Sequence, residues 1–81
     1  MIELYLSEAC PFCGKVRAYM EQKSLPYVMK PALSSDPNSR HMVELREHGG
    51  KAQVPFLFDP DKDVQMYESD DIIAYIQDNI A

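Results

Sequence analysis

Two cysteines three positions apart carry the clearest chemical signal in the sequence. Cys10 and Cys13 enclose Pro11 and Phe12, directly after a run of strand-forming residues and at the start of a helical pattern. A thiolate at Cys10 would face the unpaired N–H groups and the positive end of the helix dipole, both of which favour the anion. Cys13, about one helical turn away, could close the disulfide that releases a substrate from Cys10. The spacing therefore predicts thiol–disulfide exchange.

Two other interpretations of the cysteine pair are a zinc half-site and a pair of unrelated core cysteines. A structural zinc ion would need further nitrogen or sulfur ligands, and the candidates are His41 and His48, far along the chain on a polar helix. We expect both histidines to face solvent. The redox interpretation is favoured, and no metal is expected.

Composition limits the classes of protein that fit. A chain of 81 residues has room for one domain, residues 1–81. The net charge of −5 argues against nucleic acid as a partner, and no apolar run is long enough to span a membrane. Residues 1–6 are typical of a first strand rather than of a signal peptide. We expect a cytoplasmic protein, in which a cysteine pair is more often catalytic or metal-binding than structural.

Hydrophobic periodicity predicts the element order β-α-β-α-β-β-α. Strands are expected at 2–6, 27–29, 54–58 and 64–67, with helices after Cys10, around 42–45 and from 69 to 80. The stretch 34–38 is rich in turn residues, and Pro31 should end the second strand. The first two strands should be parallel through a right-handed crossover, and the last two antiparallel through a short turn.

Short polar side chains and glycines mark the expected ends of the later helices. Asp36 or Asn38 is a suitable N-cap for the middle helix, which Gly49-Gly50 should end. Ser69 is the expected N-cap of the last helix.

The order of these motifs resembles the glutaredoxin family of the thioredoxin-fold superfamily. The resemblance covers essentially the whole chain and rests on the cysteine motif, on the segment Gly50-Lys51-Ala52-Gln53-Val54-Pro55, and on Ser69-Asp70-Asp71. Residues 67–69 and 72–76 are also similar to the N-terminal domain of glutathione transferases, which normally carry a second, all-helical domain. The resemblance implies an α/β, thioredoxin-like fold: a four-stranded mixed sheet with helices on both faces.

The resemblance also implies a set of glutathione contacts. Pro55 would be a cis-proline packed against the cysteine pair, and the backbone at Val54 would pair with the cysteinyl part of glutathione. Ser69 and Asp70 would hold the carboxylate and the ammonium of the γ-glutamyl group, and Lys51 the glycyl carboxylate. From the residues alone, an ordinary strand-start proline, a well-capped helix and a solvated lysine are the alternatives.

The chain departs from the family pattern at several positions around these contacts. Ser7 stands where a lysine usually precedes the first cysteine, and Gln53 where a threonine usually precedes Val-Pro. Tyr67 and Glu68 replace the Gly-Gly before the acidic pair. We expect these changes to affect glutathione affinity more than thiol chemistry.

The resemblance implies a glutathione-dependent dithiol oxidoreductase that uses glutathione as co-substrate. Its partners would be proteins with disulfides or glutathione mixed disulfides, and we expect a monomer that binds neither nucleic acid nor membrane. One alternative is an electron donor recycled by thioredoxin reductase. Another is a protein that binds a glutathione-ligated iron–sulfur cluster through Cys10, against which Pro11 and Cys13 count. A non-catalytic thioredoxin-fold interaction module is a third.

Overall fold

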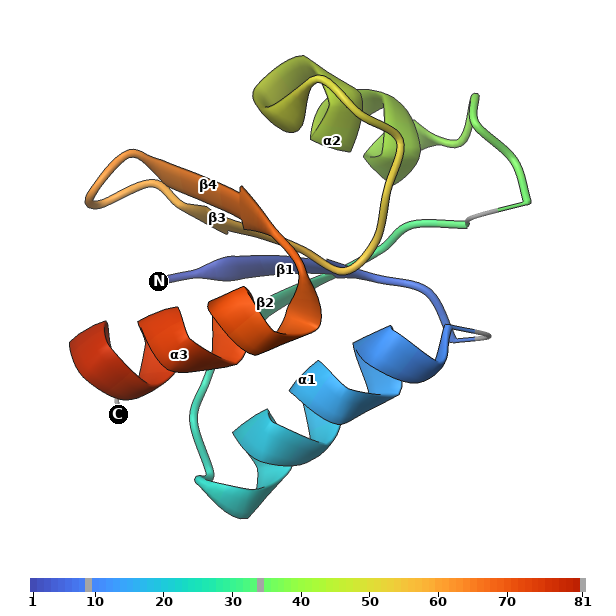
Figure 1. The fold of residues 1–81 in the computed structure, drawn as a ribbon. Helices are drawn as coiled ribbons and strands as arrows, with labels where there is room; N and C mark the ends of the chain where they lie inside the picture. Colours follow the sequence, from blue (N-terminus) through green and yellow to red (C-terminus); the bar gives the residue numbers. More distant parts are fainter. Residues whose placement is uncertain (9, 34, 81) are drawn as a thin grey trace.

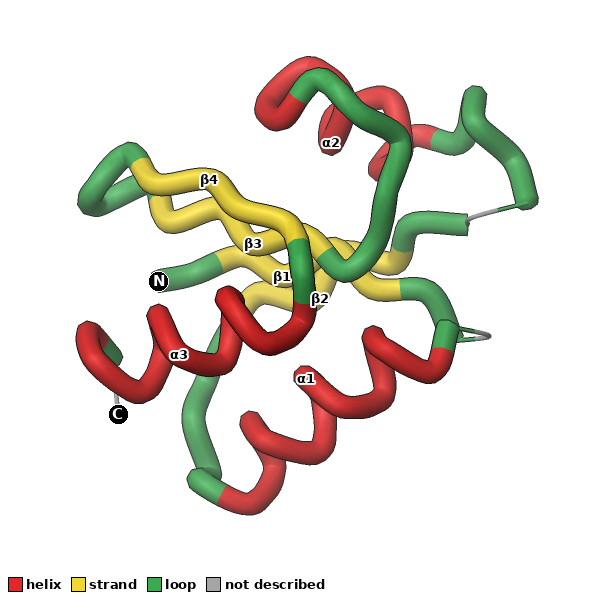
Figure 2. Tube along the Cα trace, viewed as in Figure 1, coloured by secondary structure: helices red, strands yellow, loops and turns green. Residues whose placement is uncertain are grey.

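The computed structural model describes residues 1–8, 10–33 and 35–80, and it has the predicted order β-α-β-α-β-β-α (Figure 1). Ser34, at the start of the turn-rich stretch expected at 34–38, lies outside the described residues. Figure 2 shows the same elements by type of secondary structure. The elements are β1 (Glu3–Leu6), α1 (Pro11–Gln22), β2 (Val28–Pro31), α2 (Arg40–Gly49), β3 (Phe56–Asp59), β4 (Val64–Tyr67) and α3 (Ser69–Asn79).

The four strands form one mixed sheet in the order β2-β1-β3-β4. Strand β1 is parallel to β2 and antiparallel to β3, and β3 is antiparallel to β4. In the register, Tyr5 of β1 lies opposite Phe56 of β3, which in turn lies opposite Tyr67 of β4. The end of β1, the beginning of β3 and the end of β4 therefore meet at the same edge of the sheet.

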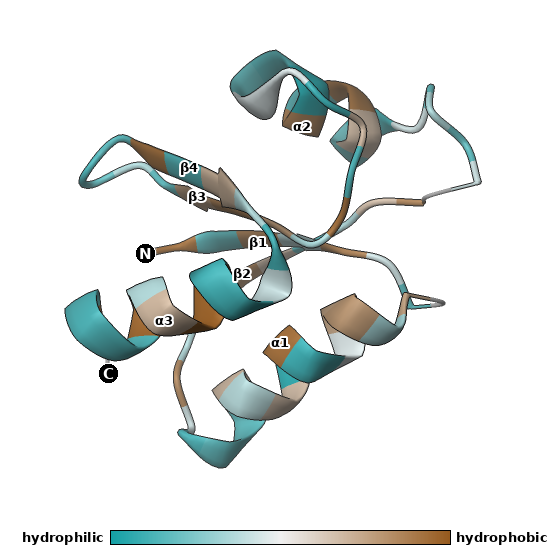
Figure 3. Ribbon diagram, in the orientation of Figure 1, coloured by the Kyte–Doolittle hydropathy of each residue, from teal (hydrophilic) through white to brown (hydrophobic). Residues whose placement is uncertain are grey.

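Helices cover both faces of this sheet, as predicted: α1 and α3 lie on one face and α2 on the other (Figure 1). Side chains of β1 alternate between the faces, as a strand requires, so that Leu4 and Leu6 join the core under α1 and α3 while Tyr5 faces α2. Figure 3 shows apolar stretches along the strands and polar turns at the ends of α1 and α3. The buried residues of the larger core are Ile2, Leu4, Leu6, Cys13, Val16, Met20, Leu57, Ile72 and Ile76. Those of the smaller core are Tyr5, Ala32, Met42, Leu45 and Phe56.

Two strand boundaries differ from the sequence prediction by two residues, and the others differ by one residue or none. Strand β2 includes Pro31, which pairs with Leu6, because β2 is an edge strand where the missing N–H of a proline is tolerated. Strand β3 begins at Phe56, after the Val54–Pro55 peptide, instead of at residue 54. The expected end of α2 is confirmed, because the helix stops at Gly49 and Gly50 follows in the left-handed region with φ 89°.

The N-cap predictions for α2 and α3 are wrong. Ser39 is the N-cap of α2, whereas the Asp36 carboxylate accepts the backbone N–H of Asn38 at 3.0 Å and forms a local turn before the helix. Glu68 is the N-cap of α3, so Ser69 occupies the first helical position.

The prediction that both histidines of α2 face solvent is also wrong, because each is partly buried. The Nδ1 atom of His41 lies 2.9 Å from the Pro31 carbonyl oxygen, and the ring of His48 stacks on Phe58 with centroids 4.2 Å apart. Both side chains thus contribute to the packing of α2 on the sheet.

A buried carboxylate joins the end of β3 to α3. Asp59 is 2% exposed, and its Oδ2 atom accepts a hydrogen bond of 2.6 Å from the Tyr75 hydroxyl. Its Oδ1 atom accepts the N–H of Asp61 at 3.1 Å. The hydrogen bond from Tyr75 lowers the pKa of Asp59. The stability that it contributes is therefore present above the pKa of the unfolded chain and is lost as pH falls through the folded pKa.

We expect Tyr75→Phe to lower the free energy of unfolding by about 1.5–3 kcal/mol near neutral pH, because it removes a hydrogen bond to a buried charged group. The difference from the parent protein should begin to shrink below the ordinary Asp pKa of about 3.9, where the unfolded chain takes up a proton, and should be lost as pH falls further through the lowered pKa of folded Asp59. Urea unfolding of both proteins across this pH range measures it. An equal loss of stability at neutral and acid pH would contradict the assignment.

Candidate active site

Cys10 lies at the N-terminus of α1. It is the N-cap residue, with extended backbone angles of φ −91° and ψ 119°, and its carbonyl oxygen accepts the N–H of Gly14 at 3.2 Å. Pro11 occupies the first helical position, where its missing N–H costs nothing. The Cys10 side chain is partly buried. Its thiol is thus held at the helix end that favours an anion and remains accessible to a second sulfur.

Cys13 has the opposite environment. Its side chain is fully buried in the core between the sheet and α1, and its Sγ atom accepts the N–H of Ser7 at 3.4 Å. Burial raises the pKa of the Cys13 thiol to about 12, while the N–H of Ser7 and the charge of Arg17 act in the opposite direction. Both cysteines are free thiols. The motif therefore places one sulfur at the surface and its partner in the core.

The segment before β3 lies against the start of α1. The Val54–Pro55 peptide is cis, as the resemblance implies, and Pro55 is buried. The carbonyl oxygen of Val54 lies 4.0 Å from the Sγ atom of Cys10, within the range of a weak S–H donor. The sheet register explains this contact, because it brings the beginning of β3 to the end of β1.

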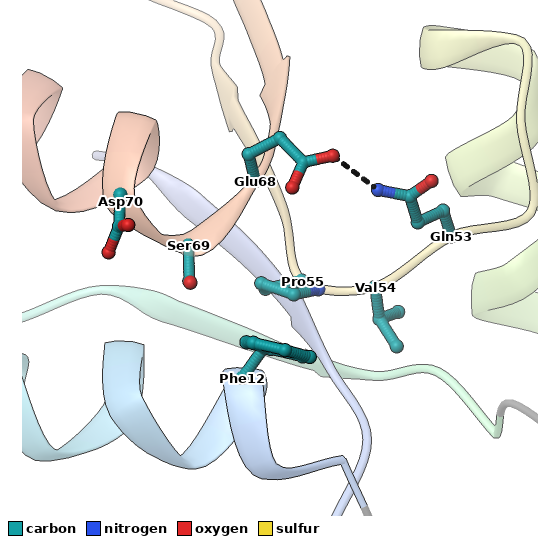
Figure 4. A pocket seen from close by; sticks show the side chains of 7 residues that line it. All are labelled: Phe12, Gln53, Val54, Pro55, Glu68, Ser69 and Asp70. Carbon is teal, nitrogen blue, oxygen red and sulfur yellow. Dashed lines mark hydrogen bonds between the residues drawn. The ribbon is translucent and has the colours of Figure 1, made fainter.

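A pocket of about 380 Å³ opens beside this contact, between the starts of α1 and α3 (Figure 4). Pro55 lies at its centre, and Phe12, whose side chain is 62% exposed, faces it from α1. The lining residues are Phe12, Gln53, Val54, Pro55, Glu68, Ser69 and Asp70. Four of the sequence-predicted glutathione contacts, at positions 54, 55, 69 and 70, are thus brought together next to Cys10.

Three polar side chains of this pocket, those of Gln53, Glu68 and Asp70, already have partners. The Nε2 atom of Gln53 donates to Oε1 of Glu68 at 3.2 Å, as the dashed line in Figure 4 shows. Asp70 forms an ion pair with Lys15 of α1. Glu68 has a φ of 71°, which is uncommon for a residue with a side chain and often marks a functional site.

Lys51 is the predicted contact that does not line the pocket. It is exposed, and its Nζ atom lies 4.7 Å from the centroid of the Tyr67 ring. Sequence reasoning also missed Gln53 and Glu68 as lining residues. Their positions directly before the Val54–Pro55 peptide and directly before Ser69 could have indicated them.

In residues 1–8, 10–33 and 35–80, no group of three or more His, Cys, Asp or Glu side chains is arranged to hold a metal ion. None of the described helices has the length and apolar character that crossing a bilayer requires.

Known proteins place this geometry in a family. The sequence profile of the glutathione S-transferase N-terminal domain matches residues 4–81. Glutaredoxin 3 of Escherichia coli strain K12 is 28% identical over 57 residues, which are 70% of this chain and 65% of that protein. The chain thus matches just under two thirds of the length of this curated relative.

Solved structures agree with this assignment. A glutathione S-transferase from Methylobacillus flagellatus with glutathione bound superposes with a TM-score of 0.79 and 25% identity, over 100% of this chain and 37% of that one. Glutaredoxin 2 from Salmonella typhimurium in complex with glutathione superposes with a TM-score of 0.76 and 29% identity, over 99% and 34% of the two chains. The present chain therefore corresponds to about a third of each structure. Because the family profile matches it from residue 4 to residue 81, the chain belongs to the glutathione S-transferase N-terminal domain family, has the thioredoxin fold, and is more distantly similar to glutaredoxins 2 and 3.

Proposed function

We propose that the protein is a glutathione-dependent dithiol oxidoreductase that reduces protein disulfides and glutathione mixed disulfides. The observation that carries this proposal is the unequal placement of two free thiols, with Cys10 at the start of α1 and Cys13 in the core. The contact between Cys10 and the Val54 carbonyl adds a backbone edge beside the reacting sulfur. Glutathione is the bound ligand in two of the similar solved structures.

The proposed reaction is thiol–disulfide exchange in two steps. The Cys10 thiolate attacks one sulfur of a substrate disulfide, so that a mixed disulfide forms and the other substrate sulfur leaves as a thiolate. Cys13 then gives up its proton, which the thiolate released in the first step can take, and its sulfur attacks the Cys10 sulfur, closes the Cys10–Cys13 disulfide and releases the second substrate thiolate. Two glutathione molecules return the pair to the dithiol and become glutathione disulfide. With a glutathione mixed disulfide, a second glutathione can replace Cys13 in the resolving step.

The pocket offers complementary groups for glutathione along its length. With the glutathione sulfur at Cys10, the cysteinyl backbone would pair with Val54 beside Pro55. The γ-glutamyl carboxylate would meet Ser69 and the first N–H groups of α3, where the helix dipole favours an anion. Asp70 would receive the γ-glutamyl ammonium, and Lys51, two residues before the lining residue Gln53, would meet the glycyl carboxylate.

Replacing each cysteine separately tests the two-step reaction. Cys10→Ser should abolish turnover, because it removes the attacking sulfur. Cys13→Ser should lose reduction of protein disulfides and keep reduction of glutathione mixed disulfides, since external glutathione resolves the adduct. NADPH consumption coupled to glutathione reductase measures both activities. Turnover by the Cys10→Ser protein would contradict the mechanism. Turnover with thioredoxin reductase but not with glutathione would leave the cysteine chemistry intact and overturn the glutathione dependence.

Alkylation of the native protein tests the difference between the two sulfurs. Iodoacetamide should label Cys10 and leave Cys13 largely unmodified near neutral pH, because Cys13 is fully buried and its pKa is raised to about 12. Peptide mass analysis of partly labelled protein identifies the modified residue, and the unfolded protein is the control in which both should react. Equal labelling of the two cysteines in the native state would contradict the assigned roles.

Neighbouring aspartates of α3 provide a matched pair for the glutathione site. Both aspartates are exposed, but Asp70 lines the pocket and Asp71 does not. We expect Asp70→Asn to raise the KM for glutathione roughly fivefold with little change in kcat, because one charge-assisted contact is lost. Asp71→Asn should leave both constants unchanged. An equal effect of the two substitutions would indicate a general electrostatic influence and contradict the proposed contact.

A further inference from the structure

Tyr67 makes an unusual set of contacts outside the pocket. Its hydroxyl donates to the carbonyl oxygen of Lys51 at 2.7 Å and accepts the N–H of the same residue at 3.0 Å. One side chain thus satisfies both backbone groups of a loop residue sixteen positions away. Such a pair of bonds fixes the position of the loop backbone at Lys51.

The Lys51 side chain is held by the same tyrosine. Its Nζ atom lies 4.7 Å from the centroid of the Tyr67 ring, a distance at which a cation is attracted to the ring face. Backbone and ammonium of Lys51 are therefore both positioned by Tyr67. A tyrosine is required for both contacts, because phenylalanine would keep the ring and lose the two hydrogen bonds.

Gly49 makes room for this arrangement. A Cβ atom at position 49 would lie 2.2 Å from the Tyr67 hydroxyl oxygen and 2.7 Å from a ring carbon of Phe56. A larger residue at the end of α2 would therefore push the Tyr67 ring away from Lys51. Gly49 thus serves close approach, whereas Gly50 serves the left-handed turn.

The contact reaches the pocket through the neighbouring residues. The Lys51 carbonyl also accepts the N–H of Gln53 at 3.0 Å, and the Gln53 side chain binds Glu68, the residue after Tyr67. Tyr67 and Glu68 thus tie the segment 51–53 to the start of α3 at two points. Lys51, two residues before the lining residue Gln53, is thus held by Tyr67 instead of moving freely as an exposed lysine would.

We propose that Tyr67 is a positioning residue that holds the Lys51 ammonium for the glycyl carboxylate of glutathione. The inference rests on the proposed glutathione-dependent function and assigns to this chain a specificity determinant at one end of the ligand. Charge supports the orientation, because Asp70 lies on the side of the pocket opposite Gln53 (Figure 4) and suits the γ-glutamyl ammonium. The carboxylate at the far end of the tripeptide then lies toward Lys51.

The test compares two ligands that differ only at this carboxylate: glutathione and its ethyl ester at the glycine. Calorimetric titration of the Cys10→Ser protein gives both dissociation constants without turnover. We expect the Cys10→Ser protein, the parent of the variants below, to bind glutathione roughly fivefold more tightly than the ester, because one charged contact is lost with the ester. Adding Tyr67→Phe should bring the ratio of the two dissociation constants close to one, by weakening glutathione and leaving the ester unchanged. Adding Gly49→Ala should have the same effect.

A double-mutant cycle shows whether Tyr67 acts through Lys51. Adding Lys51→Met should also bring the ratio close to one, and Tyr67→Phe should then have no further effect on it. Tyr19→Phe is the control, because the Tyr19 hydroxyl has no hydrogen-bond partner within the described residues, and it should keep the parent ratio. The ratio is measured within each variant, so a general loss of stability does not change it.

Two outcomes would overturn the inference. If Tyr67→Phe weakened both ligands equally, or kept the parent ratio, Tyr67 would not position Lys51 for the carboxylate, although the proposed function would stand. If neither glutathione nor the ester bound the parent protein, the proposed glutathione dependence would fail, and this inference with it. The two failures are distinguished by the binding of glutathione to the parent.

Discussion

The antiparallel pairing of β1 with β3 and of β3 with β4 is the constraint on which the site depends. The register of Tyr5, Phe56 and Tyr67 places the end of β1, the beginning of β3 and the end of β4 side by side. Each of these ends adjoins an element that lines the pocket. Strand β1 leads toward Cys10 and α1, β3 follows Pro55, and β4 leads into α3. A shift of one residue would turn every strand side chain to the other face, so burial of both sheet faces also fixes the site.

The same packing makes the two sulfurs different. Cys10 lies at the exposed start of α1, whereas Cys13, three residues later, lies on the buried face of the helix. Val16 and Met20 lie on the same buried face. Cys13 therefore belongs to the hydrophobic core, where its sulfur accepts the N–H of Ser7 and contacts the Cys10 side chain. A thiol in that place is poorly suited to meet a substrate first. It is well placed to attack Cys10 from within.

Sequence patterns predicted the features that depend on short stretches of chain. The element order follows from periodicity, and the presence of Ser69 at the start of α3 follows from a helix boundary. The cis peptide at 54–55 was implied by the family resemblance. Sequence patterns did not predict that the Lys51 ammonium lies over the Tyr67 ring, because that contact depends on the loop after α2 meeting the end of β4 and on the absence of a side chain at Gly49. The N-cap of α3 is Glu68 and not the predicted Ser69 for a similar reason. The positive φ of Glu68 is set by the joining of β4 to α3 rather than by local preference.

The acidic side chains of the pocket already have partners within the protein. These partners affect the affinity for a ligand that carries both positive and negative groups. Asp70 already has Lys15 as its partner, and Glu68 has the Gln53 amide. Glutathione would therefore exchange one set of polar contacts for another, and its net gain would be the difference between the two sets. Affinity would then come mainly from the backbone edge at Val54 and from groups held in place beforehand, of which Lys51 is the clearest case. A reducing co-substrate that must leave after each turnover suits modest affinity with a well-defined orientation, because orientation of the sulfur at Cys10 is what the exchange reaction requires.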